Sequence, residues 1–217
     1  MEIDRKIIEK IKNNTKYKNE LLNNNEKLEK EFFTSLKKYE KTLINNSSYE
    51  TALWIESNEK NISSIGKNNN IKYKEGEIVL IDLGRNNYDN EFSYTHPAII
   101  MKNTFNKIFI VPCTSQHPRK DSNGNIFPEN MIGTEKDGFE KKSVLLLYDT
   151  KFVDKNRVIS KIGKVTKDFY NRLNNQLFIE LFKNKHNEIK KLENTIKQYE
   201  NNKEKAKKTV DKEHVIC

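Results

Sequence analysis

The 217-residue sequence is poor in the residues that build disulfide, metal and membrane structures. Its two cysteines, Cys113 and Cys217, are too few for a disulfide framework. No apolar run has the length of a membrane span, and the N-terminal segment MEIDRKIIEK lacks the apolar stretch and cleavage site of a signal peptide. The sequence also lacks an H-E-x-x-H motif, a Cys/His ligand cluster and a phosphate-binding glycine loop. We therefore expect a cytoplasmic protein that uses no metal and no cofactor and does not enter a membrane.

Positive charge is in excess but is spread along the chain. The formal net charge is +9, of which residues 1–72 carry +3, residues 73–182 carry +2 and residues 183–217 carry +4. Because 35% of the residues are hydrophobic and these gather between Ile78 and Phe182, the core is expected there. That segment is nearly neutral, so the total charge alone does not indicate a nucleic-acid-binding face. Solvated lysine-rich helix faces in the two terminal arms explain the excess charge better.

Residues 76–114 carry the strongest β-strand pattern of the chain and predict three consecutive strands. The apolar and β-branched runs are Glu77–Leu83, Pro97–Met101 and Ile108–Val111. The short spacer Lys102–Lys107 fits a hairpin. The polar loop before His96 and the residues from Thr114 onward then lie at strand ends, where reactive pockets are usually built.

The rest of the β region is shorter and more polar. Ser143–Tyr148 predicts a buried strand, Thr150–Val153 its continuation, and Ile159–Val165 a last strand. Between the first three strands and Ser143, the segment His117–Lys142 is expected to be a mobile loop over the pocket, with a turn at Asp121 to Gly124.

Helices are expected on both sides of the strands. Residues 2 to about 45 show helical periodicity with a weak point at Asn13, and a short amphipathic segment follows in which Trp54 is expected to pack against the β domain. Thr166 is expected to cap a helix whose apolar stripe continues through Ile189, Leu192, Ile196 and Tyr199 with coiled-coil spacing. A continuous helix of that length would approach ~55 Å. We expect the long helices to pack on each other, within one chain or between two.

Four segments follow one another in the order GEIVLIDLG, EFSYTHPAII, IVPCTSQ and SVLLLYDTKFVDKNRVISKIGKVT. Their order and spacing resemble the PemK/MazF family of toxin endoribonucleases, over about Tyr73 to Phe182. The resemblance implies an α+β fold, a small SH3-like barrel of the PemK/MazF/CcdB type. On this reading residues 1–72 form a helical N-terminal arm, residues 73–182 the barrel domain, and residues 183–217 a helical C-terminal extension.

The resemblance also implies a function. It indicates the toxin of a type II toxin–antitoxin system, an endoribonuclease that cleaves single-stranded mRNA by attack of the 2′-hydroxyl, without a metal. The implied partners are single-stranded RNA, a cognate antitoxin protein and a second copy of the chain.

His96 is the first candidate catalytic residue. It stands directly before the proline of the second strand, where better-known family members carry an arginine of the active site. A branch of the family with the pattern E-F-S-x-x-H-x-A-I is closer to this sequence. An imidazole titrates near ~6.5, so His96 can act as acid or base where an arginine supplies only charge. The other interpretation is a histidine that forms a hydrogen bond at the start of a strand.

Thr114 is the second candidate, since Thr114 and Ser115 match the family's TS pair, whose threonine hydroxyl donates to a phosphate oxygen. A pair that merely ends a strand is the alternative. The residues expected to bind substrate are Ser115, Gln116, His117, Arg119 and Arg85, and Arg119 would supply the missing arginine charge. Arg157, further along, matches a family position for which we expect a structural role.

Two other kinds of function remain open. One is a non-catalytic protein of the same fold, either a CcdB-like gyrase poison or a nucleic-acid-binding regulator, because fold alone does not define function. The other is a scaffold whose helices act and whose barrel is inactive. The pairing of His96 with Thr114 separates these from an enzyme, since a pure binding protein does not need both.

Overall fold

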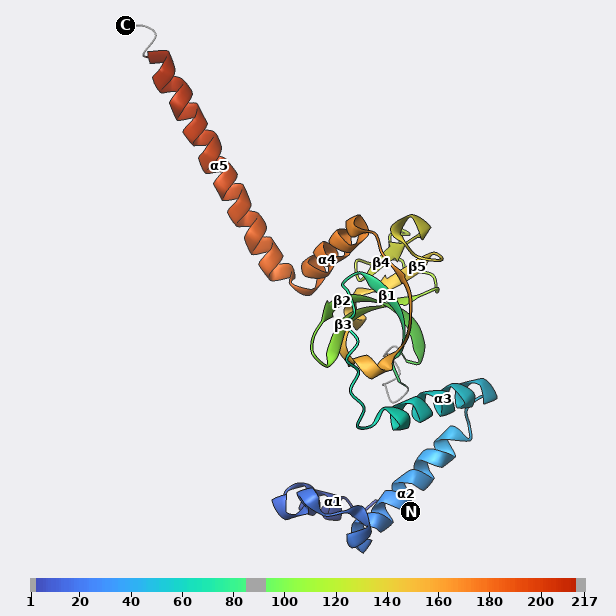
Figure 1. Cartoon of the computed structure of the whole chain (residues 1–217). Coiled ribbons are helices and arrows are strands. Elements are labelled where there is room, and N and C mark those ends of the chain that lie inside the picture. The colour runs from blue at the N-terminus through green and yellow to red at the C-terminus, as the bar shows by residue number, and fades with distance from the viewer. Residues whose placement is uncertain (1–2, 85–92, 214–217) are drawn as a thin grey trace. The chain divides into compact units, whose positions relative to one another are not determined.

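The structure of the chain is a computed structural model that describes residues 3–84 and 93–213, with side chains described as far as residue 203 (Figure 1). The chain divides into two compact units, Met1–Glu56 and Ser57–Cys217. In the described parts, no helix is both long and apolar enough to span a membrane.

The first unit is helical. It contains α1 (Arg5–Lys12), the 3₁₀ turns η1 (Thr15–Asn19) and η2 (Leu22–Asn24), and α2 (Glu26–Leu43), and it ends within α3 (Ser48–Ser64). The expected weak point is confirmed, because α1 ends at Lys12 and Asn13 forms its C-terminal cap.

Trp54 of α3 packs on α2. Its indole nitrogen donates to the hydroxyl of Tyr39 at 2.8 Å, and the two rings meet edge to face with centroids 6.0 Å apart. The contact shown for Trp54 is therefore inside the helical unit, where the sequence led us to expect one with the β domain.

The second unit is built on seven antiparallel strands: β1 (Glu77–Asp82), β2 (Thr95–Asn103), β3 (Lys107–Thr114), β4 (Asn130–Gly133), β5 (Ser143–Leu146), β6 (Lys151–Asp154) and β7 (Val158–Lys164). The order is β4-β5-β3-β2-β1-β7, with β6 also paired to β3. Figure 1 shows β1, β2 and β3 curving round a common centre. The α+β class is confirmed, and so are the three consecutive strands and the β2–β3 hairpin.

Residues 117–142 are more regular than expected. They contain β4, an isolated bridge between Lys120 and Ile126, and the 3₁₀ turn η3 (Glu135–Asp137). The carboxylate of Asp121 accepts hydrogen bonds from two main-chain N–H groups and so closes a tight turn. The expectation of a loop over the whole segment was wrong, because a four-residue strand leaves no readable periodicity in a polar segment, and the mobility of the remaining loop stays a prediction.

The strand predicted at residues 143–153 is interrupted. The 3₁₀ turn η4 (Leu147–Asp149) separates β5 from β6, and a further turn, η5 (Lys155–Arg157), separates β6 from β7. β5 pairs with Cys113 and Thr114 at the end of β3, whereas β6 pairs with its beginning. β5 and β6 are thus separate strands that pair with different parts of β3.

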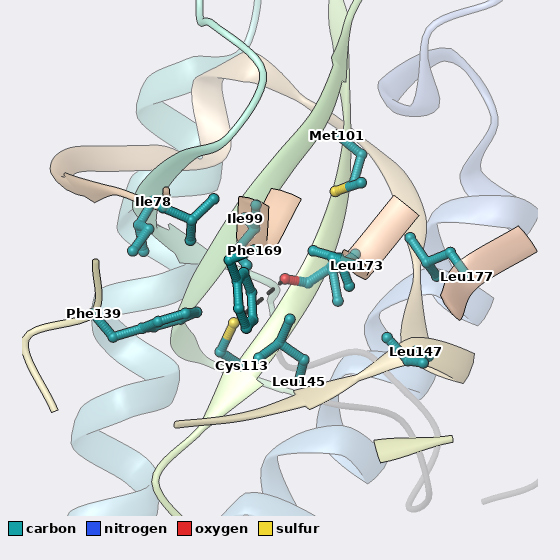
Figure 2. Close-up of a cluster of buried hydrophobic side chains, with 12 residues drawn as sticks. Ile78, Ile99, Met101, Cys113, Phe139, Leu145, Leu147, Phe169, Leu173 and Leu177 are labelled. Carbon is teal, nitrogen blue, oxygen red and sulfur yellow. Dashed lines mark hydrogen bonds between the residues drawn. The ribbon is translucent and has the colours of Figure 1, made fainter. Parts of the chain in front are cut away.

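Both faces of the central strands are buried. One face and helix α4 (Lys167–Leu181) form the cluster drawn in Figure 2, which includes Ile99, Cys113 and Phe169. The opposite face buries Ile81 and Ala98, among others. Successive side chains of a strand point to opposite faces, so burial of both explains the nearly continuous apolar runs in the sequence. Thr166 caps α4 as expected, accepting from the Phe169 N–H at 3.2 Å.

The C-terminal helix is not continuous with α4. α4 ends at Leu181, Phe182 leaves the helical region with φ −128° and ψ 42°, and α5 (Lys183–Glu213) begins after it. The single uninterrupted helix predicted from the apolar stripe was therefore wrong. The stripe residues Ile189, Leu192, Ile196 and Tyr199 are exposed, and their coiled-coil pairing stays a prediction.

Candidate functional site

His96 and Thr114 lie at the same end of two neighbouring strands. Ala98 of β2 pairs with Pro112 of β3. His96 is two residues before Ala98 and Thr114 two residues after Pro112, so in an antiparallel pair both lie beyond that position and on one face. On its other side His96 pairs with Ile81 of β1. The strand register therefore places the two candidate residues at neighbouring strand ends, and their catalytic roles stay a prediction.

The backbone before His96 is held in an uncommon conformation. Tyr94 has a φ of 68°, which is rare for a residue other than glycine. Its main chain is fixed on both sides, because its carbonyl accepts from Leu83 N–H and its own N–H donates to the Gly84 carbonyl, each at 2.8 Å. Such strain is retained where the surroundings over-determine it, and it concentrates at functional sites.

The imidazole of His96 is half-buried. Burial lowers the pKa of His96 below its ordinary value of 6.5, and a hydrogen bond with the Ser93 main chain opposes part of that shift. At neutral pH the ring is mostly uncharged and has a nitrogen that accepts a proton. This protonation state suits a general base better than a source of positive charge.

Thr114 is 8% exposed, and its hydroxyl oxygen accepts a hydrogen bond from the Gln116 N–H at 3.2 Å. That bond turns the chain away from β3 and fixes the oxygen at the strand end. A hydroxyl that accepts one bond still carries a proton to donate. The next three residues, Ser115, Gln116 and His117, are exposed beyond it.

Arg119 lies on a small hairpin that follows. Its carbonyl accepts from Phe127 N–H at 3.1 Å, and its guanidinium lies 6.0 Å from the centre of the Phe127 ring. The structure thus places a cation and an aromatic ring side by side, rather than a cation held against Thr114. Arg85, the other arginine expected to bind substrate, lies outside the described residues.

Asp82 and Arg157 join the site without having been expected there. Asp82 ends β1 and is 6% exposed; its Oδ1 accepts from the Ser57 hydroxyl at 3.2 Å and from Gly84 N–H at 2.8 Å. Arg157 Nη1 donates to the Asp82 carbonyl at 3.2 Å. A carboxylate at the end of an apolar run was a readable signal, but the approach of Arg157, 75 positions away, had none.

Neither a metal site nor a reactive thiol is apparent in the part of the chain that the structure describes. No group of three or more His, Cys, Asp or Glu side chains there is placed to hold a metal ion. Cys113 is fully buried in the cluster against α4, and burial raises the pKa of its thiol to about 12. The described strand ends present an imidazole, hydroxyls, the Asp82 carboxylate and a guanidinium.

The described strands and helices define an α+β domain built on an antiparallel sheet, with His96 and Thr114 at the ends of adjacent strands. Residues 74–181 match the family described as PemK-like, MazF-like toxin of type II toxin–antitoxin system, and through this domain the chain belongs to that family. A search of curated proteins found no match.

Several solved structures align with about half of the chain. An endoribonuclease in complex with its cognate antitoxin, from a mycobacterial species, is 17% identical over 51% of this chain and 95% of its own, with a TM-score of 0.38. MazF from Deinococcus radiodurans is 13% identical over 51% and 97%, with a TM-score of 0.41. The MazE–MazF structure from the same organism is 15% identical over 50% and 95%, with a TM-score of 0.38.

Proposed function

We propose that this protein is the toxin of a type II toxin–antitoxin pair and that it cleaves single-stranded RNA. Membership of the toxin family supports the first half of the proposal. The second half is carried by one observation: His96 and Thr114 occupy one face at one end of β2 and β3.

The reaction begins at the 2′-hydroxyl of the nucleotide before the cleaved bond. The neutral imidazole of His96 accepts the 2′-hydroxyl proton while the 2′-oxygen attacks the neighbouring phosphorus. A lowered pKa keeps His96 in this accepting form at neutral pH.

Negative charge then grows on the phosphate oxygens. The Thr114 hydroxyl, held by its bond from Gln116 N–H, donates to one of them. As the 2′-oxygen bond forms, the bond from phosphorus to the 5′-oxygen breaks, and the 5′-oxygen takes a proton from water. The products are a 2′,3′-cyclic phosphate and a 5′-hydroxyl end.

The exposed residues around this pair would bind the RNA. Ser115, Gln116 and His117 offer hydrogen-bonding groups at the end of β3, and Arg119 with Phe127 offers a guanidinium and a ring on which an unpaired base can stack. Stacking requires unpaired bases, which is why the proposed substrate is single-stranded.

Two protein partners belong to the proposal. A cognate antitoxin follows from the family, whose members act in toxin–antitoxin systems. We also expect a second copy of the chain, forming a homodimer. Light scattering on the purified protein tests the dimer, since a mass of 25.7 kDa would show a monomer and twice that value a dimer.

Analysis of RNA product ends tests the reaction. The purified protein is expected to cut a single-stranded RNA and leave 2′,3′-cyclic phosphate and 5′-hydroxyl ends. The double variant His96→Ala/Thr114→Ala, prepared in parallel, controls for contaminating nucleases. Ends with a 5′-phosphate, or equal cleavage by the double variant, would contradict the proposal.

A further inference from the structure

The end of the sheet that carries His96 also carries a fixed arginine. Ile81 of β1 pairs with His96 of β2 on one side and with Val158 of β7 on the other. Arg157 directly precedes Val158, so it lies at the same end of the sheet. Because neighbouring strands are ~4.8 Å apart, the backbones of β2 and β7 are separated here by about 10 Å.

The side chain of Arg157 is positioned against β1. Its Nη1 donates to the Asp82 carbonyl at 3.2 Å, and a Cβ added to Gly84 would lie 3.0 Å from that same nitrogen. Gly84 has a φ of +81°, a conformation that favours glycine, and it leaves room for the guanidinium. Asp82 is itself fixed by Ser57 and Gly84.

The charge of Arg157 is not neutralised by any ion pair within the described residues. On β1, Arg157 contacts the main-chain carbonyl of Asp82. The carboxylate Oδ1 of Asp82 already accepts two other hydrogen bonds. A guanidinium has five N–H donors in a planar fork. Arg157 is an exposed residue, and the bond to Asp82 uses one of its donors.

We propose that Arg157 binds a phosphate of the RNA backbone next to the one that is cleaved. A planar fork of donors matches phosphate oxygens bidentately, and the bond to Asp82 orients the fork before substrate arrives. The guanidinium reaches back from β7 to the end of β1, the strand next to β2, and so would lie to one side of the scissile bond. Arg157 is thus a substrate-binding residue, and the proposed RNA-binding surface extends from the end of β3 across β2 and β1 to β7.

This inference rests on the proposed action on RNA, so its test separates binding from cleavage. The probe is a fluorescein-labelled, single-stranded 2′-O-methyl oligonucleotide of degenerate sequence, which has no free 2′-hydroxyl and is not cut. Fluorescence anisotropy gives its affinity at several salt concentrations. Arg157→Gln is the main variant, because glutamine keeps a donor for the Asp82 carbonyl and loses the charge.

Arg157→Gln is expected to weaken binding about tenfold, as loss of one charge-assisted contact does. The slope of log affinity against log salt should fall by about 0.7, the value for one phosphate contact on a single strand. Lys164→Ala is the matched control: Lys164 is exposed at the opposite end of β7, beside Glu77 of β1. It should leave both quantities unchanged.

Three outcomes bear on the idea. Binding by Arg157→Gln that equals wild type in affinity and salt slope would overturn it and leave Arg157 as a strut for β1, with the proposed cleavage unaffected. An equal loss of affinity in Lys164→Ala would also overturn the proposal, because positive charge anywhere on the surface would then contribute equally to RNA binding. A wild-type protein that neither binds the probe nor cuts RNA would remove the proposed function and this inference together.

Discussion

The hydroxyl of Ser57, in α3, lies 3.2 Å from Oδ1 of Asp82, at the end of β1. The same oxygen accepts a bond from Gly84 N–H, while Arg157 holds the Asp82 carbonyl. A buried carboxylate thus ties a helix, a strand end and a loop together beside His96. The candidate site is supported by this junction as well as by the sheet.

Asp82→Ala is therefore expected to destabilise the β domain. The Ser57 hydroxyl and the Gly84 N–H would lose their acceptor, which costs about 1–3 kcal/mol in the free energy of unfolding. Ser57→Ala should cost less, about 1 kcal/mol, because the bond to Gly84 remains. Urea unfolding measures both.

Ser63→Ala is the control for that comparison. Ser63 is on the same helix, and its hydroxyl donates to the carbonyl of Lys60 in that helix. If Ser57→Ala and Ser63→Ala unfold alike, the bond between Ser57 and Asp82 does not contribute to stability.

RNA cleavage should persist in EDTA. The proposed reaction uses an imidazole and a hydroxyl at the strand ends, and neither group needs a divalent ion to accept or donate a proton. The measurement is the rate of cutting of one RNA with and without chelator. Loss of activity in EDTA that Mg²⁺ or Mn²⁺ restores would replace this mechanism with a metal-dependent one.

Thr114→Ala should slow cleavage ~10²-fold without unfolding the protein, as removal of one donor to a developing negative charge does. Thr114→Ser keeps the hydroxyl and should retain most of the rate. Circular dichroism checks the fold of each variant. A folded Thr114→Ala that cuts at the wild-type rate would remove Thr114 from the site.

Cys113 should resist thiol reagents while the protein is folded. Burial raises its pKa to about 12, so the reactive thiolate is scarce at pH 8, and no reagent reaches a fully buried sulfur. The assay is the absorbance change with a disulfide reagent in a Cys217→Ser background, native and in urea. Rapid labelling of the native protein would show that the cluster against α4 opens readily.

The parts of the fold that the sequence predicted are those with a strong local signal. β1, β2 and β3 are buried on both faces, so their sequences are long runs of apolar residues. β4 was missed because Asn130–Gly133 is four residues long and stands in a polar segment. The end of α4 was missed because an apolar stripe can continue through a residue such as Phe182 that leaves the helix.

The candidate site shows the same limit. His96 and Thr114 were proposed from motifs, and the pairing of β2 with β3 places them at neighbouring strand ends. The bonds from Ser57 to Asp82 and from Arg157 to Asp82 join positions 25 and 75 residues apart. Such contacts depend on the tertiary fold, and they cannot be predicted from a local pattern in a single sequence.

The pH dependence of cleavage is the sharpest test of His96. A general base works in its neutral form, and burial lowers the pKa of His96. The rate should therefore be flat at neutral pH and fall as pH decreases through a value below 6.5, rather than at the ordinary value for imidazole. The measurement is the cleavage rate of one RNA from pH 5 to 9, with the fold checked at each pH.

Two substitutions decide what His96 contributes. His96→Ala should largely abolish cleavage at every pH, since the base is gone. His96→Arg distinguishes proton transfer from charge, because a guanidinium remains protonated throughout this range. An inactive His96→Arg supports the base, while an active one with a flat pH profile would show that the residue acts through its charge. A flat wild-type profile together with an active His96→Ala would reduce His96 to a residue that forms a hydrogen bond at the start of β2, and proton transfer would then be sought at His117.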